Sequence, residues 1–231
     1  MVRTATAESL GADVYAGIRS AILNGDFQPG QRLKALELRG RFGGVSLSVV
    51  REALSRLAAE RLVVARYNQG FTVAEVTAKG IVDLTSIRCL IEGHALRLSI
   101  ERGDFEWESA VVAAHHVLRR TPRRSPGAGG TPEAWAIAHR VFHKALIGAC
   151  DIPDLLDICN SLMNGSELYR RVAARVSDGT RDVDQEHENL MALAVARKTD
   201  EALAAFESHL QCTASQVLTG LELDRNGVGS D

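Results

Sequence analysis

The chain has 231 residues, which is enough for one large domain or two small ones. Apolar residues make up 45% and charged residues 24%, a composition that supports a sizeable core and excludes a wholly disordered chain. Aromatic residues make up only 5%, while Ala, Leu, Val and Arg are abundant, which favours helices over a β-sandwich. The sequence has no run of 18 apolar residues, no signal peptide and no CxxC pair among its four cysteines. These features predict a cytoplasmic protein with reduced thiols and no membrane segment.

The net charge of −2 conceals an uneven distribution along the chain. Residues 1–75 carry ten Lys or Arg against seven Asp or Glu, a net charge of +3. The remaining residues carry 17 basic and 22 acidic side chains, a net charge of −5. A weakly basic head on an acidic body predicts different partners for the two parts, although the excess is too small to establish nucleic-acid binding.

The first 75 residues predict three helices and a β-hairpin. Apolar residues at helical spacing indicate a helix over 9–24 and a short helix over about 35–42. A third helix begins after Ser46, whose hydroxyl can cap it. The β-prone residues 62–65 and 71–73 flank a turn and predict a hairpin. This order of elements is typical of a winged helix-turn-helix.

The remaining residues predict helices and no further strand. Apolar residues recur at helical spacing, interrupted by a Pro/Gly/Ser-rich exposed loop at 121–132. We expect six helices, over 78–102, 105–120, 132–149, 152–175, 183–197 and 200–219. The predicted fold is therefore mostly α, with a winged helix-turn-helix domain at 1–77, an all-helical bundle at 78–222 and a disordered tail at 223–231.

The beginning of the third helix carries side chains that suit DNA. The second helix of a helix-turn-helix lies in the major groove, with its N-terminal residues nearest the bases. The positions concerned are Ser46, Leu47, Ser48 and Arg51. A serine hydroxyl can bond a phosphate or a base, and Arg51 can bind guanine with two hydrogen bonds. On these residues alone, a solvated helix face with a capping serine explains the pattern as well.

Three segments of the head form a more specific pattern: IRSAILNGDFQPGQRLKALEL, VSLSVVREALSRLAAERLV and NQGFTV. Over about 65 residues they resemble the DNA-binding domain of the GntR family of bacterial transcription regulators. The resemblance implies that the recognition helix reads bases and that Gly70 lies at a wing tip in the minor groove, where a bare backbone can approach closely. We include Lys34 among the DNA-binding residues. Leu47 stands where the family usually has Arg, which implies a different operator preference.

Two of the seven histidines, His139 and His143, are four residues apart, so both rings lie on one face of a helix. Neutral imidazole is a good ligand for Zn, Ni, Cu or Fe, so the pair suits a transition metal. Ordinary surface or core histidines fit the same pattern. His187 and His209 belong to two further predicted helices, and their spacing does not show whether they meet the pair.

A looser pattern in the body consists of Arg88-x-x-x-Glu92, Phe142-His143, Glu186-His187 and His209-Leu210. It resembles the FCD ligand domain of FadR-like GntR regulators, a helical bundle in which many members bind a metal through an Asp and three histidines. The resemblance covers about 78–220 and implies that His143, His187 and His209 are ligands and that His139 occupies the Asp position. Four neutral ligands favour Zn or Ni over Mn or Mg. A closed tetrahedral site, a six-coordinate site with two open positions and metal-free effector binding all remain open.

Arg88 is the candidate effector-binding residue. Its spacing to Glu92 predicts an i,i+4 surface salt bridge that contributes roughly a few tenths of a kcal/mol. Its fork of donors also suits a carboxylate clamp, and in FCD domains this Arg commonly faces the effector. Both interpretations remain open.

Together these features predict a GntR-type, FadR-like transcription regulator, expected to be a repressor and not an enzyme. We expect a homodimer that binds an inverted repeat of operator DNA. Its effector is expected to be a small carboxylate, bound at a histidine-lined site that contains Zn or Ni. One alternative is a metal-dependent helix-bundle hydrolase, although such an enzyme has no use for a winged helix and the chain lacks G-x-S-x-G. The other is a DNA-binding dimer with a vestigial effector site.

Overall fold

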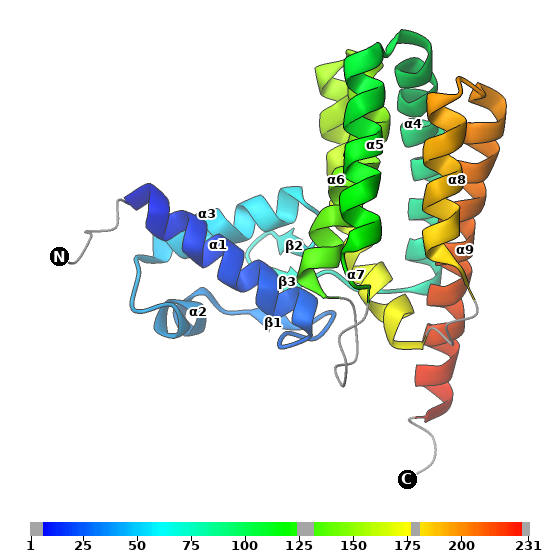
Figure 1. Cartoon of the computed structure of the whole chain (residues 1–231). Coiled ribbons are helices and arrows are strands. Elements are labelled where there is room, and N and C mark those ends of the chain that lie inside the picture. The colour runs from blue at the N-terminus through cyan, green and yellow to red at the C-terminus, as the bar shows by residue number, and fades with distance from the viewer. Residues whose placement is uncertain (1–6, 124–131, 177–180, 228–231) are drawn as a thin grey trace. The chain divides into compact units, whose positions relative to one another are not determined.

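The computed structural model describes residues 7–123, 132–176 and 181–227 (Figure 1). Contacts between Cα atoms divide the chain into two compact units, Met1–Val76 and Thr77–Asp231, which we call the head and the body. Both units are mainly helical, and within the described ranges strands occur only in the head. The predicted fold class, a winged helix-turn-helix followed by an all-helical bundle, is confirmed.

Three helices make up most of the head: α1 (Ala7–Asn24), α2 (Ala35–Arg41) and α3 (Leu47–Ala59). α3 packs against both of the other helices. Its Leu54 and Leu57 are three residues apart, lie on one face and are fully buried. The amphipathic pattern of the sequence therefore positions α3 with one apolar face inward and its polar face toward solvent.

A small antiparallel sheet completes the head. Its strands are β1 (Arg32–Leu33), β2 (Val63–Arg66) and β3 (Gly70–Val73), in the order β1-β3-β2. β2 and β3 form the predicted hairpin, with Arg66 opposite Gly70 at its end. β1 was not predicted, because a strand of two residues is too short to show an alternating pattern.

The turn between α2 and α3 depends on two glycines. Gly43 and Gly44 have φ values of +73° and +76°, a region that L side chains rarely adopt. The Gly44 N–H donates to the Arg39 carbonyl over 2.9 Å and so satisfies one of the free carbonyls at the end of α2. These residues close α2 and allow a new helix to begin only a few residues later.

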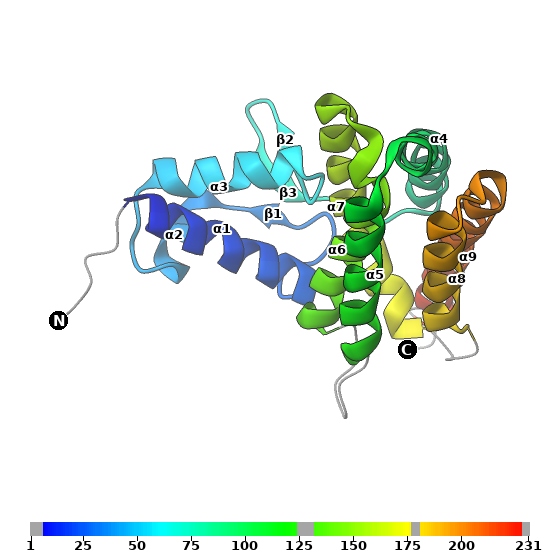
Figure 2. The ribbon, with the colours of Figure 1, turned by 45° about the horizontal axis from the view of Figure 1, so that its top comes forward.

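The body consists of six α-helices and one 3-10 turn in the described ranges. They are α4 (Ala78–Arg102), α5 (Phe105–Arg120), α6 (Glu133–Ile147), η1 (Gly148–Cys150), α7 (Pro153–Val176), α8 (Val183–Val195) and α9 (Thr199–Gly227). α4 packs against α6, α7 and α9, while α5 packs against α6 and α8. Figures 1 and 2 both show α5 beside α6 and α8 beside α9. The three helices that carry the histidines of interest, α6, α8 and α9, therefore belong to one bundle.

The predicted disordered tail at 223–231 is wrong in its first part, because α9 continues to Gly227. Each residue added to an existing helix gains one backbone hydrogen bond without a new nucleation cost, so α9 can extend into a polar segment. Residues 228–231, and residues 124–131 of the predicted exposed loop, lie outside the described residues.

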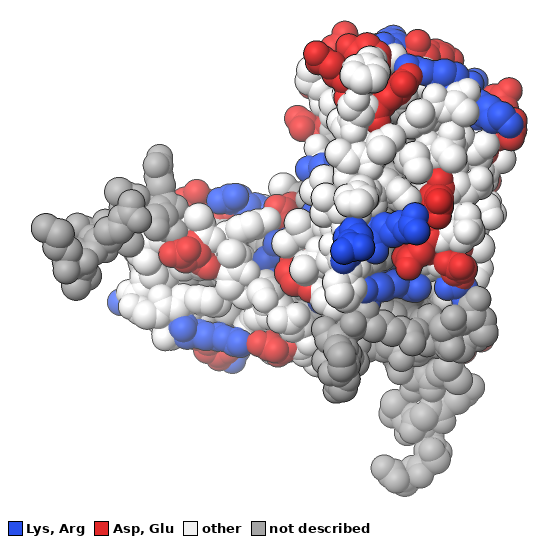
Figure 3. Space-filling model, in the orientation of Figure 1, with Lys and Arg blue, Asp and Glu red and all other residues white. Residues whose placement is uncertain are grey.

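The surface carries both signs of charge. On the face shown in Figure 3, basic and acidic side chains are interspersed on the head and on the body. This face therefore presents no uniformly basic unit, in agreement with the small charge excess of the head. In the described part of the chain, no helix is both long and apolar enough to cross a membrane.

Candidate metal centre and nucleic-acid interface

Four histidines meet inside the body. His139 and His143 come from consecutive turns of α6, His187 from α8 and His209 from α9. All four are buried, and each offers a ring nitrogen within 4.8 Å of those of the others. The prediction left open whether the two later histidines reach the pair on α6, and the packing of α8 and α9 brings them there.

The capping of α8 helps to position His187. Asp182 precedes the helix and its side chain accepts a hydrogen bond from the Gln185 N–H over 2.9 Å. Such a cap satisfies one of the free N–H groups in the first turn and stabilises the helix by about 1 kcal/mol. His187 lies one turn further along and is only 1% exposed. The cap therefore fixes the turn from which this ring enters the bundle.

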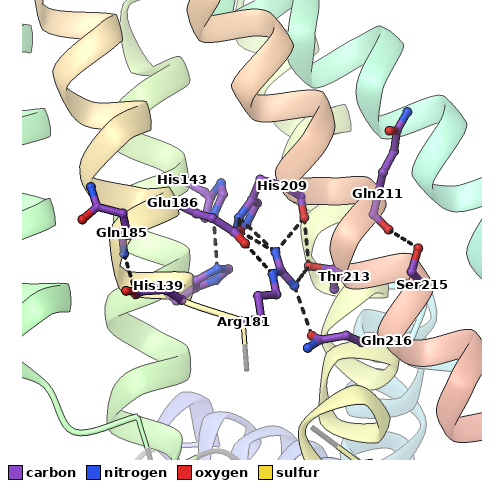
Figure 4. Close-up of polar contacts among 11 residues, drawn as sticks. His139, His143, Arg181, Gln185, Glu186, His209, Gln211, Thr213, Ser215 and Gln216 are labelled. Carbon is purple, nitrogen blue, oxygen red and sulfur yellow. Dashed lines mark hydrogen bonds and ion pairs between the residues drawn. The ribbon is translucent and has the colours of Figure 1, made fainter. Parts of the chain in front are cut away.

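His209 has a carboxylate behind it. Its Nδ1 lies 2.7 Å from Oε2 of Glu186 (Figure 4). Burial alone would raise the pKa of Glu186, but hydrogen bonds with His209 and Arg181 lower it to about 2. A carboxylate on the remote nitrogen orients an imidazole and leaves its other nitrogen free to bind a metal. His209 thus has the outer partner that a metal ligand requires.

Arg181 connects this carboxylate to α9. It donates from Nε and Nη2 to the two carboxylate oxygens of Glu186, each over 2.6 Å. Its Nη1 donates to Thr213 and Gln216 over 2.9 and 3.1 Å (Figure 4). The same guanidinium also lies 3.3 Å from His209 Nδ1 and donates to the His209 carbonyl over 2.9 Å. The segment before α8 and the middle of α9 are therefore held together around His209.

The four imidazoles are held neutral. Burial is the main cause that lowers the pKa of all four histidines below the ordinary value, and neighbouring cationic groups lower it further. For His209 the hydrogen bond with Glu186 acts in the opposite direction but does not outweigh burial. A neutral imidazole is the form that binds a metal, so the site is prepared for coordination without loss of protons.

The donor set fits a transition metal. Both ring nitrogens of His187 and Nδ1 of His143 are buried without a hydrogen-bond partner among the described residues. Buried polar atoms almost always have partners, so the two unpartnered nitrogens of His187 indicate that a further group binds there. Imidazole suits Zn, Ni, Cu and Fe better than Mn or Mg. The four clustered histidines would hold such an ion, which would supply a positive charge for an anionic ligand.

His139 has a different outer partner. Its Nδ1 lies 2.7 Å from Nη1 of Arg170, a residue of α7 that also contacts Glu167. Its Nε2 lies 3.1 Å from Nε2 of His143. The indole of Trp135 stacks on the ring, with centroids 4.7 Å apart and planes at 27°. His139 is thus held on one face and at both nitrogens.

A hollow opens beside the histidines. It is lined by Trp135, His139 and His209 together with three arginines, Arg123, Arg170 and Arg181. A cationic lining beside a flat aromatic ring suits a small anionic organic molecule. Neither the arginines nor Trp135 were among the predicted site residues. They belong to no short motif, so only the packed bundle reveals them.

Arg88 lines a second, smaller hollow, on the side of His139 and His143. The predicted pair with Glu92 forms, with two hydrogen bonds of 2.6 and 3.0 Å. The prediction of a surface salt bridge is wrong, because Arg88 is 7% exposed and Glu92 is fully buried. Helical spacing predicted the partner of Arg88 correctly but gave no information about how deeply the pair is buried. The role of Arg88 as an effector clamp stays a prediction.

The predicted DNA-binding residues are all exposed in the head. Ser46 caps α3, its hydroxyl accepting from the Val49 N–H over 3.3 Å and lying 2.7 Å from the Ser48 hydroxyl. The other predicted contacts are exposed as well: Lys34 beside Glu37, Leu47 and Arg51 on α3, and Gly70 at the wing. Tyr67 in the wing turn, which was not predicted, is 92% exposed. The DNA-contact roles themselves stay predictions.

Comparison with known proteins agrees with this architecture. Residues 10–73 match the family of bacterial regulatory proteins called gntR, and residues 83–211 match the FCD domain. The HTH-type transcriptional regulator BphR of Paraburkholderia xenovorans (strain LB400) is 33% identical over 94% of this chain and 88% of its own length. The HTH-type transcriptional repressor GlaR of Escherichia coli (strain K12) is 30% identical over 86% of this chain and 91% of its own.

A solved structure shares the fold. Escherichia coli McbR/YncC superposes with a TM-score of 0.71 at 20% identity, over 91% of this chain and 98% of that one. The winged head and helical body define a DNA-binding transcription regulator rather than an enzyme, which excludes the hydrolase alternative. The chain belongs to the GntR family and its body is an FCD domain, a class that binds small-molecule effectors and metal ions.

Proposed function

We propose that this protein is a FadR-like repressor that binds operator DNA as a homodimer and is released by a small carboxylate. The effector would bind in the body, at the histidine cluster with a Zn or Ni ion. The observation that carries the proposal is the convergence of four buried histidines beside a hollow lined by three arginines. Neutral rings supply ligands for a metal and the arginines supply partners for an anion.

On the DNA side, the exposed first turn of α3 supports the proposal. The N-terminal residues of a recognition helix are nearest the bases, and around the beginning of α3 the exposed positions are Ser46, Leu47, Ser48 and Arg51. A dimer with two-fold symmetry is expected to prefer an inverted repeat. The repressor GlaR, similar over most of both chains, supports repression as the outcome. We expect the protein to act in the cytoplasm, where its operator lies.

Fluorescence anisotropy with the full-length protein tests this function. The target is DNA from upstream of the protein's own gene. We titrate a panel of small mono- and dicarboxylic acids, with and without Zn²⁺, and use the matching neutral amides as controls. We expect one acid to weaken DNA binding by 1–3 kcal/mol, the coupling typical of allosteric proteins, and the amides to leave it unchanged. DNA binding that no acid alters would support a dimer with a vestigial effector site.

Analytical ultracentrifugation of the same samples tests the homodimer. We expect dimers in free solution and one dimer per inverted repeat on DNA. A monomer that binds single half-sites would contradict this part of the proposal.

A further inference from the structure

His139 and His209 are not equivalent members of the cluster, and the difference lies in the group that faces the outer nitrogen of each ring. For His143 and His187, no partner of the outer nitrogen lies among the described residues. Behind His209 stands the carboxylate of Glu186, at 2.7 Å. Behind His139 stands the guanidinium of Arg170, also at 2.7 Å. A metal-bound imidazole donates its outer N–H to a carboxylate, carbonyl or water. Arg170 can accept no such bond, because a guanidinium offers only N–H donors.

This contact determines the tautomer of His139. Since Arg170 donates to Nδ1, that nitrogen must carry a lone pair, and in a neutral imidazole the proton is then on Nε2. Nε2 is the nitrogen that points to His143, 3.1 Å away. The atom of His139 that faces the cluster therefore bears a hydrogen and has no lone pair for a metal.

The distance between His139 and His143 does not by itself distinguish a hydrogen bond from shared coordination. Two imidazole nitrogens about 2.0–2.1 Å from one tetrahedral ion would be about 3.4 Å apart, close to the observed 3.1 Å. A rotation of the ring by 180° would place carbon atoms against both Arg170 and His143 and lose both contacts. The stacked indole of Trp135 and the contact of Arg170 with Glu167 hold the observed arrangement.

We infer that the metal site uses three histidines, His143, His187 and His209, and that His139 is a hydrogen-bond donor to the metal's anionic ligand. A metal held by His143 Nε2 would occupy the lone pair that now accepts from the His139 N–H. A carboxylate oxygen at the open position of the metal would replace that acceptor. Arg170 is the positioning residue, because it fixes the tautomer and adds positive charge beside the anion. This inference rests on the proposed metal-dependent function and replaces the predicted four-histidine site.

The test counts imidazoles around Co²⁺ in the full-length protein. Metal-free protein is loaded with one equivalent of Co²⁺, X-ray absorption gives the number of imidazole ligands, and a competing chelator gives the Kd. We expect three imidazoles in the wild type. We also expect added acetate to change the visible spectrum of the bound Co²⁺, because a position is open. Four imidazoles in the wild type would overturn the inference.

Two matched substitutions on α6 separate the roles of the rings. His139→Gln keeps an N–H donor near the position of Nε2, so it should change the Co²⁺ Kd by less than about tenfold. Loss of a residue that orients a metal ligand typically weakens metal affinity by about 10–100-fold. His143→Gln, one turn away, should weaken Co²⁺ binding by more than about 100-fold. Equal losses in the two variants would indicate that both rings are ligands.

Arg170→Met provides a test that does not depend on changing a ring of the cluster. Without the guanidinium, His139 can turn a lone pair toward the metal. We expect four imidazoles, a tighter Co²⁺ Kd and no response to acetate. An unchanged coordination number and Kd would overturn the role of Arg170. A wild-type protein that binds no Co²⁺ would overturn this inference and the metal part of the proposed function together, while four imidazoles in the wild type would overturn this inference alone.

Discussion

The head and the body place their functional side chains in opposite environments. In the head, the candidate DNA contacts are exposed and come from one helix turn and one wing, with Lys34 at the beginning of α2. In the body, His139, His143, His187 and His209 are buried and come from three helices. Water can satisfy the polar groups of an exposed surface, so a short segment can build it. A buried group is shielded from bulk water only by packed structure on every side, so the cluster requires several helices packed together.

Arg88→Ala should produce the largest stability effect, because it leaves the carboxylate of Glu92 buried and unpaired. Removing one partner of a buried ion pair costs about 3–5 kcal/mol. The matched change in the head is Lys34→Ala, whose partner Glu37 is exposed, and it should cost less than about 1 kcal/mol. Urea unfolding followed at both units measures the two losses. Equal losses of unfolding free energy in the two variants would show that burial does not distinguish the two ion pairs.

That result also affects how an effector clamp is tested. Because Arg88→Ala disturbs the fold, loss of an effector response in that variant does not establish direct contact. The double variant Arg88→Gln/Glu92→Gln removes both charges together and is expected to keep most of the stability. A normal carboxylate response in the double variant would exclude the clamp.

His187→Ala should remove metal-dependent stabilisation of the body. A ligand that binds only the folded state at 1,000 times its Kd stabilises it by about 4 kcal/mol. Thermal unfolding with and without excess Zn²⁺ can be followed by tryptophan fluorescence, since both tryptophans, Trp107 and Trp135, belong to the body. His94→Ala, at an exposed histidine, is the control and should retain the full response. Zn²⁺ stabilisation that survives in the His187 variant would exclude this ring as a ligand.

Mild acid should destabilise the metal-free body more than the head. Burial lowers the pKa of the four clustered histidines, so below pH 6.5 the unfolded chain binds protons that the folded body does not. Stability is therefore complete above about pH 6.5 and falls with decreasing pH, by at most about 1.4 kcal/mol per pH unit for each histidine. All seven histidines belong to the body.

Hydrogen exchange, corrected for the intrinsic pH dependence of its rate, reports on the two units separately between pH 7.5 and 5.5. We expect loss of protection in α6 and α8 and little change in α3. Parallel losses in both units would contradict the assignment to the histidines.

Arg51→Ala should weaken operator binding by about 1–3 kcal/mol if Arg51 forms two hydrogen bonds with a guanine. Ser55→Ala, further along the exposed side of α3, should change the affinity by less than about 0.5 kcal/mol. Fluorescence anisotropy at fixed salt concentration measures both variants. Wild-type affinity in the Arg51 variant would remove this residue from the contacts.

The same contrast explains how much the sequence could predict. The head was predictable because its signals are local: a capping serine, an apolar stripe on α3 and a hairpin turn. Within the described residues of the head, the element that was missed is the two-residue strand β1. The helices of the body were also predictable, although α9 extends to Gly227. The outer partners Arg170 and Arg181 were not, since they approach His139 and His209 from 31 and 28 residues away along the chain, and only side-chain packing brings them together.

Gly70→Ala should have a small and local effect on stability. Gly70 has a φ of +85°, and a Cβ built there meets nothing within 4 Å, so the cost is conformational and about 1 kcal/mol. Gly11→Ala is the control of opposite sign. Gly11 lies inside α1 and also has open space around it, so an alanine there should stabilise the head by about 0.5–1 kcal/mol. If the wing enters a groove, the added methyl of Gly70→Ala also weakens operator binding. Full operator affinity in a destabilised Gly70→Ala variant would show that the wing tip does not contact DNA closely.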